Sequence, residues 1–209
     1  MATSDTEIAN MALLRFGNGQ ISSLTEGTEA ADRLNLVYAN SRDSVLRAHP
    51  WNFAIRRATL ALSATTPNHE YTYQHALPSD PYCLKVIRTE WDANGFLGSA
   101  VYGFPGVHGI SAPVAYRIEG RFLMCNETVA RIEYIARITD VSQYDELFVD
   151  VLAQRLAAEV CVSFTGNQSM AKGLWDVYVN KLDEARGVDG QEGTPREVVD
   201  VSPWLIARI

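Results

Sequence analysis

Hydrophobic residues recur at helical spacing in the first fifty residues of the chain. Ser4 and Glu7 have the spacing of a capping box, which satisfies two backbone donors at a helix start. Apolar positions then follow near the 3.6-residue period up to Gly17, where a helix is expected to stop. A second, longer helix is expected over 28–48. His49-Pro50 ends it, because the residue before a proline is pushed out of the helical region.

The same helical period returns in the last third of the chain. One helix is expected over about 144–164, closed by Gly166, and another over 168–186, with Gly187 just past its end. The second of these helices is expected to turn one face toward the core, formed by Leu174, Val177, Tyr178, Lys181, Leu182 and Ala185.

Between these helical regions the pattern predicts short strands. After a helical turn at 51–57, with Trp51 and Phe53 as core anchors, strands are expected at 59–62, 71–73 and 82–87. The clearest signal comes from strands at 114–118, 122–125 and 129–138. The last of them alternates apolar and polar residues with a period of two, which is typical of a half-buried strand. We interpret these three strands as an antiparallel meander.

These elements predict an α+β protein. A helical bundle is expected from the N-terminal helices, within residues 1–58, and the C-terminal helix pair, within 140–186. A small antiparallel sheet is inserted between them at 59–139, and 187–209 form an extended arm. With 209 residues, of which 47% are hydrophobic and 21% charged, the composition is that of an ordinary globular protein.

Two segments carry apolar residues that these elements do not use. Residues 187–201 are rich in Gly, Glu, Asp and Pro, so they have little to bury. They lead to an apolar tip that we expect to dock on another molecule, through Trp204, Leu205, Ile206 and Ile209. The glycine-rich loop 94–113 is either a contact loop or an insertion without function. Its candidate contact residues are Phe96, Tyr102, Phe104 and Val107.

Charge and cysteine content exclude several classes of protein. A net charge of −7 disfavours a protein that grips DNA with a basic face. No apolar run approaches the roughly 20 residues of a membrane helix, and the first residues lack the features of a signal peptide. We therefore expect a soluble protein made in the cytoplasm. Three scattered cysteines without C-x-x-C spacing predict reduced thiols and no zinc site: Cys83, Cys125 and Cys161.

Motifs of catalysis and of cofactor binding are missing from the sequence. There is no phosphate-binding loop, no dinucleotide fingerprint and no nucleophile elbow. His69 and His75 do not have the spacing of metal ligands, and we expect them to be ordinary surface or hydrogen-bonded residues. Cys83 is expected to be a small buried residue rather than an activated thiolate. The sequence therefore predicts no catalytic residues, no cofactor and no metal.

One enzymatic alternative stays open, a hydrolase of cell-wall glycan. Such an enzyme needs two carboxylates roughly 5 to 9 Å apart across a cleft. Glu119 and Glu133 would lie on neighbouring strands of the predicted meander, which makes them the candidate pair. Glu133 alternates with Arg131 and Arg137, however, and this pattern is typical of a solvated, salt-paired face.

The order of features along residues 6–186 resembles the head-to-tail adaptors of tailed bacteriophages, the tail-tubular-protein-A and tail-accessory-factor group. The stretches that carry the resemblance are His49-Pro50-Trp51-Asn52-Phe53-Ala54 with Arg56-Arg57, Tyr71-Thr72-Tyr73-Gln74-His75-Ala76-Leu77-Pro78, Cys83-Leu84-Lys85-Val86-Ile87, Tyr116-Arg117-Ile118-Glu119-Gly120, Ile132-Glu133-Tyr134, Tyr144-Asp145-Glu146-Leu147-Phe148 and Leu182-Asp183-Glu184-Ala185-Arg186.

This resemblance implies a structural virion protein and not an enzyme. Twelve copies would form a ring between the portal protein and the next tail or nozzle component, with genomic DNA passing through the lumen without specific binding. The C-terminal arm would reach the portal or a neighbouring subunit. A third hypothesis is an assembly chaperone or binding module that never enters the particle.

Overall fold

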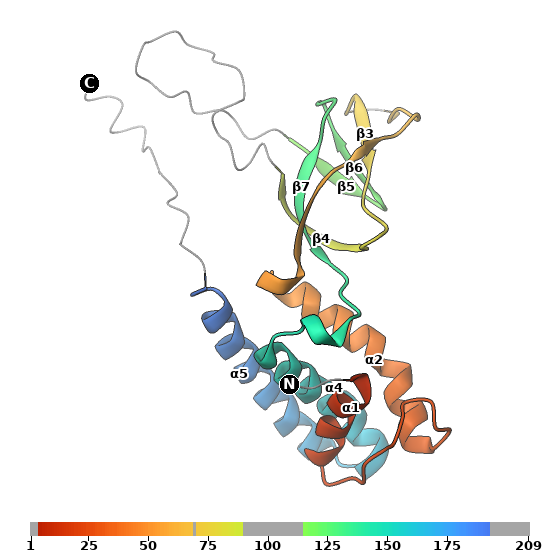
Figure 1. The fold of residues 1–209 in the computed structure, drawn as a ribbon, viewed down its shortest axis with the longest axis vertical. Helices are drawn as coiled ribbons and strands as arrows, with labels where there is room; N and C mark the ends of the chain where they lie inside the picture. Colours follow the sequence, from red (N-terminus) through yellow and green to blue (C-terminus); the bar gives the residue numbers. More distant parts are fainter. Residues whose placement is uncertain (1–3, 69, 90–114, 193–209) are drawn as a thin grey trace, which may run out of the picture.

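The computed structural model describes residues 4–68, 70–89 and 115–192. Within them the chain forms four α-helices and two small antiparallel sheets, which confirms the α+β class. The helices lie at one end of the long axis of the molecule and the strands at the other (Figure 1). We refer to these two ends as the helical part and the strand part.

The four helices begin where local sequence supplies a capping side chain. They are α1 (Asp5–Leu14), α2 (Glu29–Ala48), α4 (Glu146–Thr165) and α5 (Gln168–Asp189). Each is preceded by a residue whose side-chain oxygen accepts a hydrogen bond from a backbone N–H of the first turn. These capping residues are Ser4, Thr28, Asp145 and Asn167. The starts of the helices are therefore fixed by neighbours in the sequence.

Helix α4 is the centre of the helical part. It packs against α1, α2 and α5, and eleven of its twenty residues are buried. Its polar residues tie the neighbouring helices together: Asp150 forms ion pairs with Arg15, the residue that follows α1, and with Lys181 of α5. On another side, Ser41 of α2 donates a hydrogen bond to Glu159.

The last helix is longer than the sequence predicts. We expected it to end at Arg186 with Gly187 outside, but α5 continues to Asp189 and is followed by Gly190. The predicted inner face is also too wide, because Val177 is 43% exposed. Both errors have a tertiary cause: α5 packs on α4 along a narrow stripe, and its end is held by residues 49–52.

The seven strands form two sheets. The first has the order β1-β7-β4 and the second the order β2-β3-β6-β5. The strands are β1 (Ile55–Thr59), β2 (Ala61–Leu62), β3 (Tyr73–Ala76), β4 (Cys83–Thr89), β5 (Arg117–Glu119), β6 (Phe122–Cys125) and β7 (Arg131–Ala136). Two short 3₁₀ helices, η1 (Asn52–Ala54) and η2 (Val141–Gln143), lead into β1 and toward α4.

The predicted three-stranded meander is wrong in its last strand. β5 and β6 pair as a hairpin, but β7 leaves them and lies between β1 and β4 in the other sheet. The alternating residues of β7 are buried as expected, yet Ile135 on the opposite face is 1% exposed as well. A central strand pairs along both of its edges, and β7 does so with β1 on one side and β4 on the other.

Candidate functional site

The predicted docking residues lie outside the described part of the chain. This holds for the tip residues Trp204, Leu205, Ile206 and Ile209, and for the loop residues Phe96, Tyr102, Phe104 and Val107. The structure does describe the position from which the C-terminal segment starts, at the end of α5. That position lies beside the junction between the helical part and the strand part (Figure 1).

An aromatic cluster forms the base of this junction. Trp51 is fully buried, and its indole Nε1 donates a hydrogen bond to Val45 O at 2.9 Å. The rings of Trp51 and Phe53 each meet Phe148 of α4 edge-on, with centroids 5.2 and 5.1 Å apart. Edge-to-face aromatic pairs add about 0.5–1.5 kcal/mol beyond the area they bury. The segment that connects α2 to β1 is thus fixed against the central helix.

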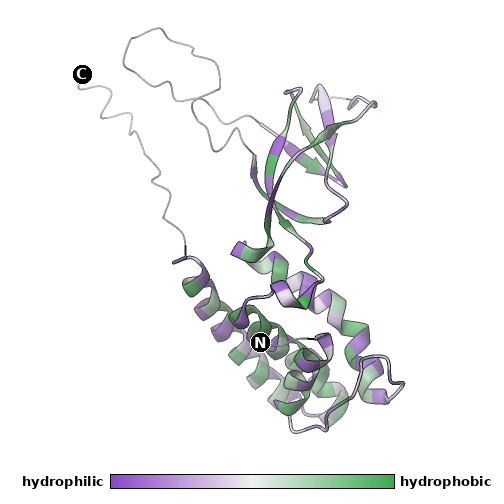
Figure 2. Ribbon diagram, in the orientation of Figure 1, coloured by the Kyte–Doolittle hydropathy of each residue, from purple (hydrophilic) through white to green (hydrophobic). Residues whose placement is uncertain are grey.

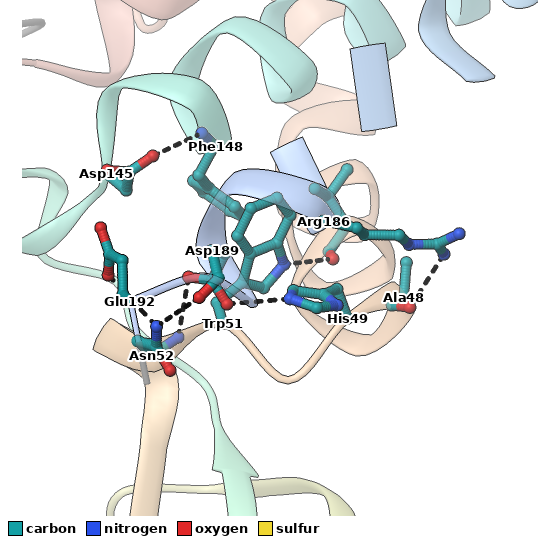
Figure 3. A network of polar contacts seen from close by, with 10 residues as sticks. Ala48, His49, Trp51, Asn52, Asp145, Phe148, Arg186, Asp189 and Glu192 are labelled. Carbon is teal, nitrogen blue, oxygen red and sulfur yellow. Dashed lines mark hydrogen bonds and ion pairs between the residues drawn. The ribbon is translucent and has the colours of Figure 1, made fainter. Parts of the chain in front are cut away.

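Polar residues on either side of Trp51 hold the end of α5 (Figure 3). His49 Nε2 lies 2.8 Å from Asp189 Oδ2, and the Asn52 backbone N–H donates to Asp189 Oδ1 at 3.2 Å. The Asn52 side-chain amide donates to Asp189 O at 2.9 Å and to Glu192 Oε2 at 3.2 Å. The Asp189 side chain is only 11% exposed, so these donors replace water as the hydrogen-bond partners of its carboxylate.

A further contact fixes α5 to the end of α2. Arg186 donates from its guanidinium to Ala48 O at 3.0 Å, and this carbonyl belongs to the last residue of α2. A cationic side chain that binds a carbonyl at a helix C-terminus satisfies a group left without an intrahelical partner. The end of α5 is therefore anchored to the connection between α2 and β1, although more than 130 residues separate the two in the sequence.

The outer surface of α5 is the second notable feature of the helical part. Four large hydrophobic side chains of this helix are between 41% and 45% exposed: Trp175, Val177, Val179 and Val188. Hydrophobic stretches of α5 alternate with hydrophilic ones in Figure 2. Trp175 and Val179 lie four residues apart on one side of the helix, whereas Val177 and Val188 lie on another side. A contiguous exposed apolar patch is typical of a surface that contacts another molecule.

Trp175 is held in place although it is exposed. Its ring centroid lies 5.1 Å from the Arg155 guanidinium carbon and 5.1 Å from the ring centroid of Tyr178. Arg155 is fixed in turn by an ion pair with Glu159, whose other oxygen accepts from Ser41 of α2. A tryptophan that is already ordered loses little side-chain entropy when it binds a partner, and Trp with Arg is common at binding hot spots.

The carboxylate pair of the glycan hydrolase alternative is not assembled. Glu119 lies on β5 and Glu133 on β7, and these strands belong to different sheets. A hydrogen bond from Arg88, supported by Arg57, lowers the pKa of Glu133, whereas a glycosidase acid needs a raised pKa. Glu119 is exposed and pairs with Arg117 at 3.1 Å. The expectation that they lie on neighbouring strands is wrong.

Two other carboxylates do line one cavity, although no sequence motif predicts that they meet. A cavity of about 470 Å³ between α1 and the start of α4 is lined by Glu7 and Glu146, with Ser142 and Tyr144 beside them. Each glutamate lies in the first turn of its helix. A negative charge there is favoured by the helix dipole, which explains both residues without chemistry.

The remaining candidates, the described histidine His75 and the three cysteines, are buried residues of the core. His75 is fully buried on β3, with Nε2 3.0 Å from Glu127 O, so the expected hydrogen-bonded histidine is confirmed. Cys83, Cys125 and Cys161 are all buried and free, as predicted. Burial raises the pKa of the Cys83 thiol, which disfavours the reactive thiolate. In the described ranges, no three His, Cys, Asp or Glu side chains form a group that could hold a metal ion.

Helices of the described residues also lack a span that is both long and apolar enough to cross a membrane. A comparison with protein-family models finds no matching family, and a comparison with curated proteins finds no matching relative.

Proposed function

We propose that this chain is a structural virion protein, a head-to-tail adaptor of a tailed bacteriophage. In this proposal the helices of the two chain ends form a bundle, the sheets are an insertion in it, and the C-terminal segment is an extended docking arm. Copies assemble into a ring, twelve-fold as in the family the sequence resembles. The ring lies between the portal and the next tail component and extends the DNA channel.

The observation that carries this proposal is the outer face of α5. Only three of its 22 residues are buried, Tyr178, Leu182 and Ala185, while an ordered Trp175 and Val179, four residues apart and on one face, stay exposed. A ring with head-to-tail contacts needs two different adhesive faces on each subunit. The face of α5 is a candidate for one of them, and Leu36 of α2, 79% exposed, marks a second apolar position on another helix.

The anchored end of α5 supports the docking role of residues 193–209. A binding segment is more effective when it starts from a fixed point, because fewer conformations are lost on binding. Asp189 and Glu192 are held by Asn52, and Arg186 by the end of α2. The segment that carries Trp204 thus follows a fixed point beside the junction.

Overall charge supports a conduit for DNA that does not bind it. A net charge of −7 per copy repels phosphate groups, and the effect adds up over a ring. A channel that must release its genome gains nothing from a basic lining.

Assembly of the purified full chain with and without a portal protein tests the proposal. Sedimentation and negative-stain imaging should show rings, and Trp175→Gln with Val179→Gln should weaken their formation while the monomer stays folded. Deletion of 202–209 should spare the fold but reduce portal binding. Val129→Gln, at an exposed valine of the strand part, is the matched control. A chain that stays monomeric with portal protein and is absent from particles would favour the chaperone hypothesis and contradict the adaptor.

The hydrolase alternative has its own test. Release of soluble fragments from peptidoglycan by the wild-type chain, lost in Glu133→Gln, would support it. Because the structure brings Glu7 and Glu146 together, Glu7→Gln and Glu146→Gln belong in the same series. Absence of turnover in the wild-type chain removes this alternative.

A further inference from the structure

A cavity of about 300 Å³ lies at the end of the three-stranded sheet that is far from the helices. It is formed where β1 and β4 end and β7 begins, since Thr59 pairs with Arg131 and Thr89 with Ile132. Its volume falls at the lower end of the range of small-ligand sites. The lining residues are Arg57, Ala58, Thr59, Arg88, Thr89, Arg131, Ile132 and Glu133.

Positive charge dominates this cavity even though the protein is acidic. Glu133 on the central strand β7 is opposite Arg57 of β1 and Arg88 of β4. Both guanidinium groups bind the same carboxylate oxygen, Oε2, with Arg57 Nε at 3.1 Å. One carboxylate neutralises only one of these two guanidinium charges, and Arg131 adds a third guanidinium to the lining.

The two arginines differ in a way that suits ligand binding. The Arg88 side chain is 20% exposed and Glu133 12%, so this pair is the fixed floor of the cluster. The Arg57 side chain is 74% exposed. A guanidinium has five N–H donors, and the single contact with Glu133 leaves Arg57 with donors that match an oxyanion.

We propose that this cavity binds a single oxyanion group, a carboxylate or a phosphate, through Arg57 and Arg88. Arginine binds both kinds of group with paired hydrogen bonds. The site is independent of the proposed adaptor function, because none of its residues lies on α5 or beside Trp51.

The charge distribution favours a single oxyanion over a nucleic acid. A duplex binds through several phosphates at once and needs an extended basic surface. Here the positive charge is confined to one cavity on a chain of net charge −7, whose field repels a polyanion. A small anion, or one acidic side chain of a protein, carries far less charge than a polyanion, so the same field repels it much less.

Titration of the full chain with inorganic phosphate at constant ionic strength, followed by calorimetry or amide NMR shifts, tests the site. Glu133→Gln removes the competing carboxylate and keeps its shape, so phosphate should bind about tenfold more tightly. Arg57→Gln should weaken binding about fivefold. The matched control is Arg117→Gln, since Arg117 is also an exposed strand arginine whose Nε lies 3.1 Å from a glutamate. It should leave binding unchanged.

Thermal melting without phosphate shows which variants are folded. If Glu133→Gln does not fold, the comparison of Arg57→Gln with Arg117→Gln tests the proposal on its own. Equal effects of Arg57→Gln and Arg117→Gln, or no phosphate binding by the wild type, overturn the proposal. The proposal is also overturned if a short DNA duplex binds more tightly than phosphate and this binding is lost in Arg57→Gln. If phosphate also dissociates an oligomer, the natural oxyanion is a carboxylate of a second copy, and if not, it is a free anion. Either result supports the site.

Discussion

Helices α4 and α5 are neighbours of similar length, yet the protein uses them in opposite ways. In α4, eleven of twenty residues are buried and contacts extend to α1, α2 and α5. In α5, three of 22 residues are buried, and its main packing partner is α4. One helix is the core of the helical part, and the other covers that core with one stripe and presents the rest to the surroundings.

This difference separates stability from assembly within one helical hairpin. Substitutions in α4 remove buried contacts, which a folded chain needs. Substitutions on the outside of α5 remove surface that only a partner would bury. Variants of the two helices should therefore fall into two classes, one with altered unfolding and one with altered association.

Phe148→Ala in α4 should have the largest effect. This side chain is fully buried and its ring contacts Trp51, Phe53 and Tyr144. Loss of a buried phenylalanine costs about 3–5 kcal/mol of unfolding free energy, measured by denaturant unfolding of the full chain. Val162→Ala on the same helix, 40% exposed, should stay within about 0.5 kcal/mol. A similar loss of unfolding free energy in the two variants would show that the buried side of α4 contributes no more to stability than its exposed side.

Asp150→Ala should have the second-largest effect on the unfolding free energy. Asp150 pairs with Arg15 and Lys181, and the Arg15 side chain is only 16% exposed. Without the carboxylate a largely buried guanidinium loses its ion pair, which costs about 1–3 kcal/mol. Asp183→Ala is the control, because that carboxylate is 65% exposed and its pair with Arg186 is screened by water. A loss no greater than that of the control would show that this network does not couple α4 to its neighbours.

Asp189→Ala should act locally. It removes the carboxylate that binds His49 and the Asn52 N–H, at a cost of about 1 kcal/mol. Hydrogen exchange should rise over the last turn of α5 and stay unchanged in its first turns. Asp176→Ala, at an exposed position of the same helix, should change neither quantity. Protection that persists at the end of α5 would mean that the anchor there does not depend on Asp189.

Val179→Gln should have the smallest effect on stability. The side chain is 42% exposed, so the unfolding free energy should change by less than about 0.5 kcal/mol. Together with Trp175→Gln it should nevertheless weaken ring formation, measured by sedimentation. Destabilisation by more than 2 kcal/mol would place Val179 in the core and end the distinction between the two helices.

Local sequence predicted the helices of this protein well. Thr28, Asp145 and Asn167 cap their helices through hydrogen bonds to residues two or three positions away. Gly166 ends α4 with a φ of 65°, which glycine adopts without strain. Such signals are contained in a few consecutive residues, so no knowledge of the rest of the chain is required.

The candidate sites were predicted less well. The role of Asn52 and Asp189 was missed because 137 residues separate them and neither has an unusual sequence context. The cluster of Arg57, Arg88 and Glu133 was missed for the same reason, since three strands contribute one residue each. The expected proximity of Glu119 and Glu133 was wrong because it assumed that consecutive strands pair.

The amino-acid sequence by itself determined where the helices start, that the alternating apolar residues of β7 are buried and that the chain is acidic. These properties follow from caps, periodicity and composition, all of which are local or additive. The tertiary structure alone decided that β7 pairs with β1 and β4, that α5 continues to Asp189 and that Val177 faces outward. Each of these features depends on contacts between residues that are far apart in the sequence. A pattern of a few consecutive residues therefore does not contain the information that decides it.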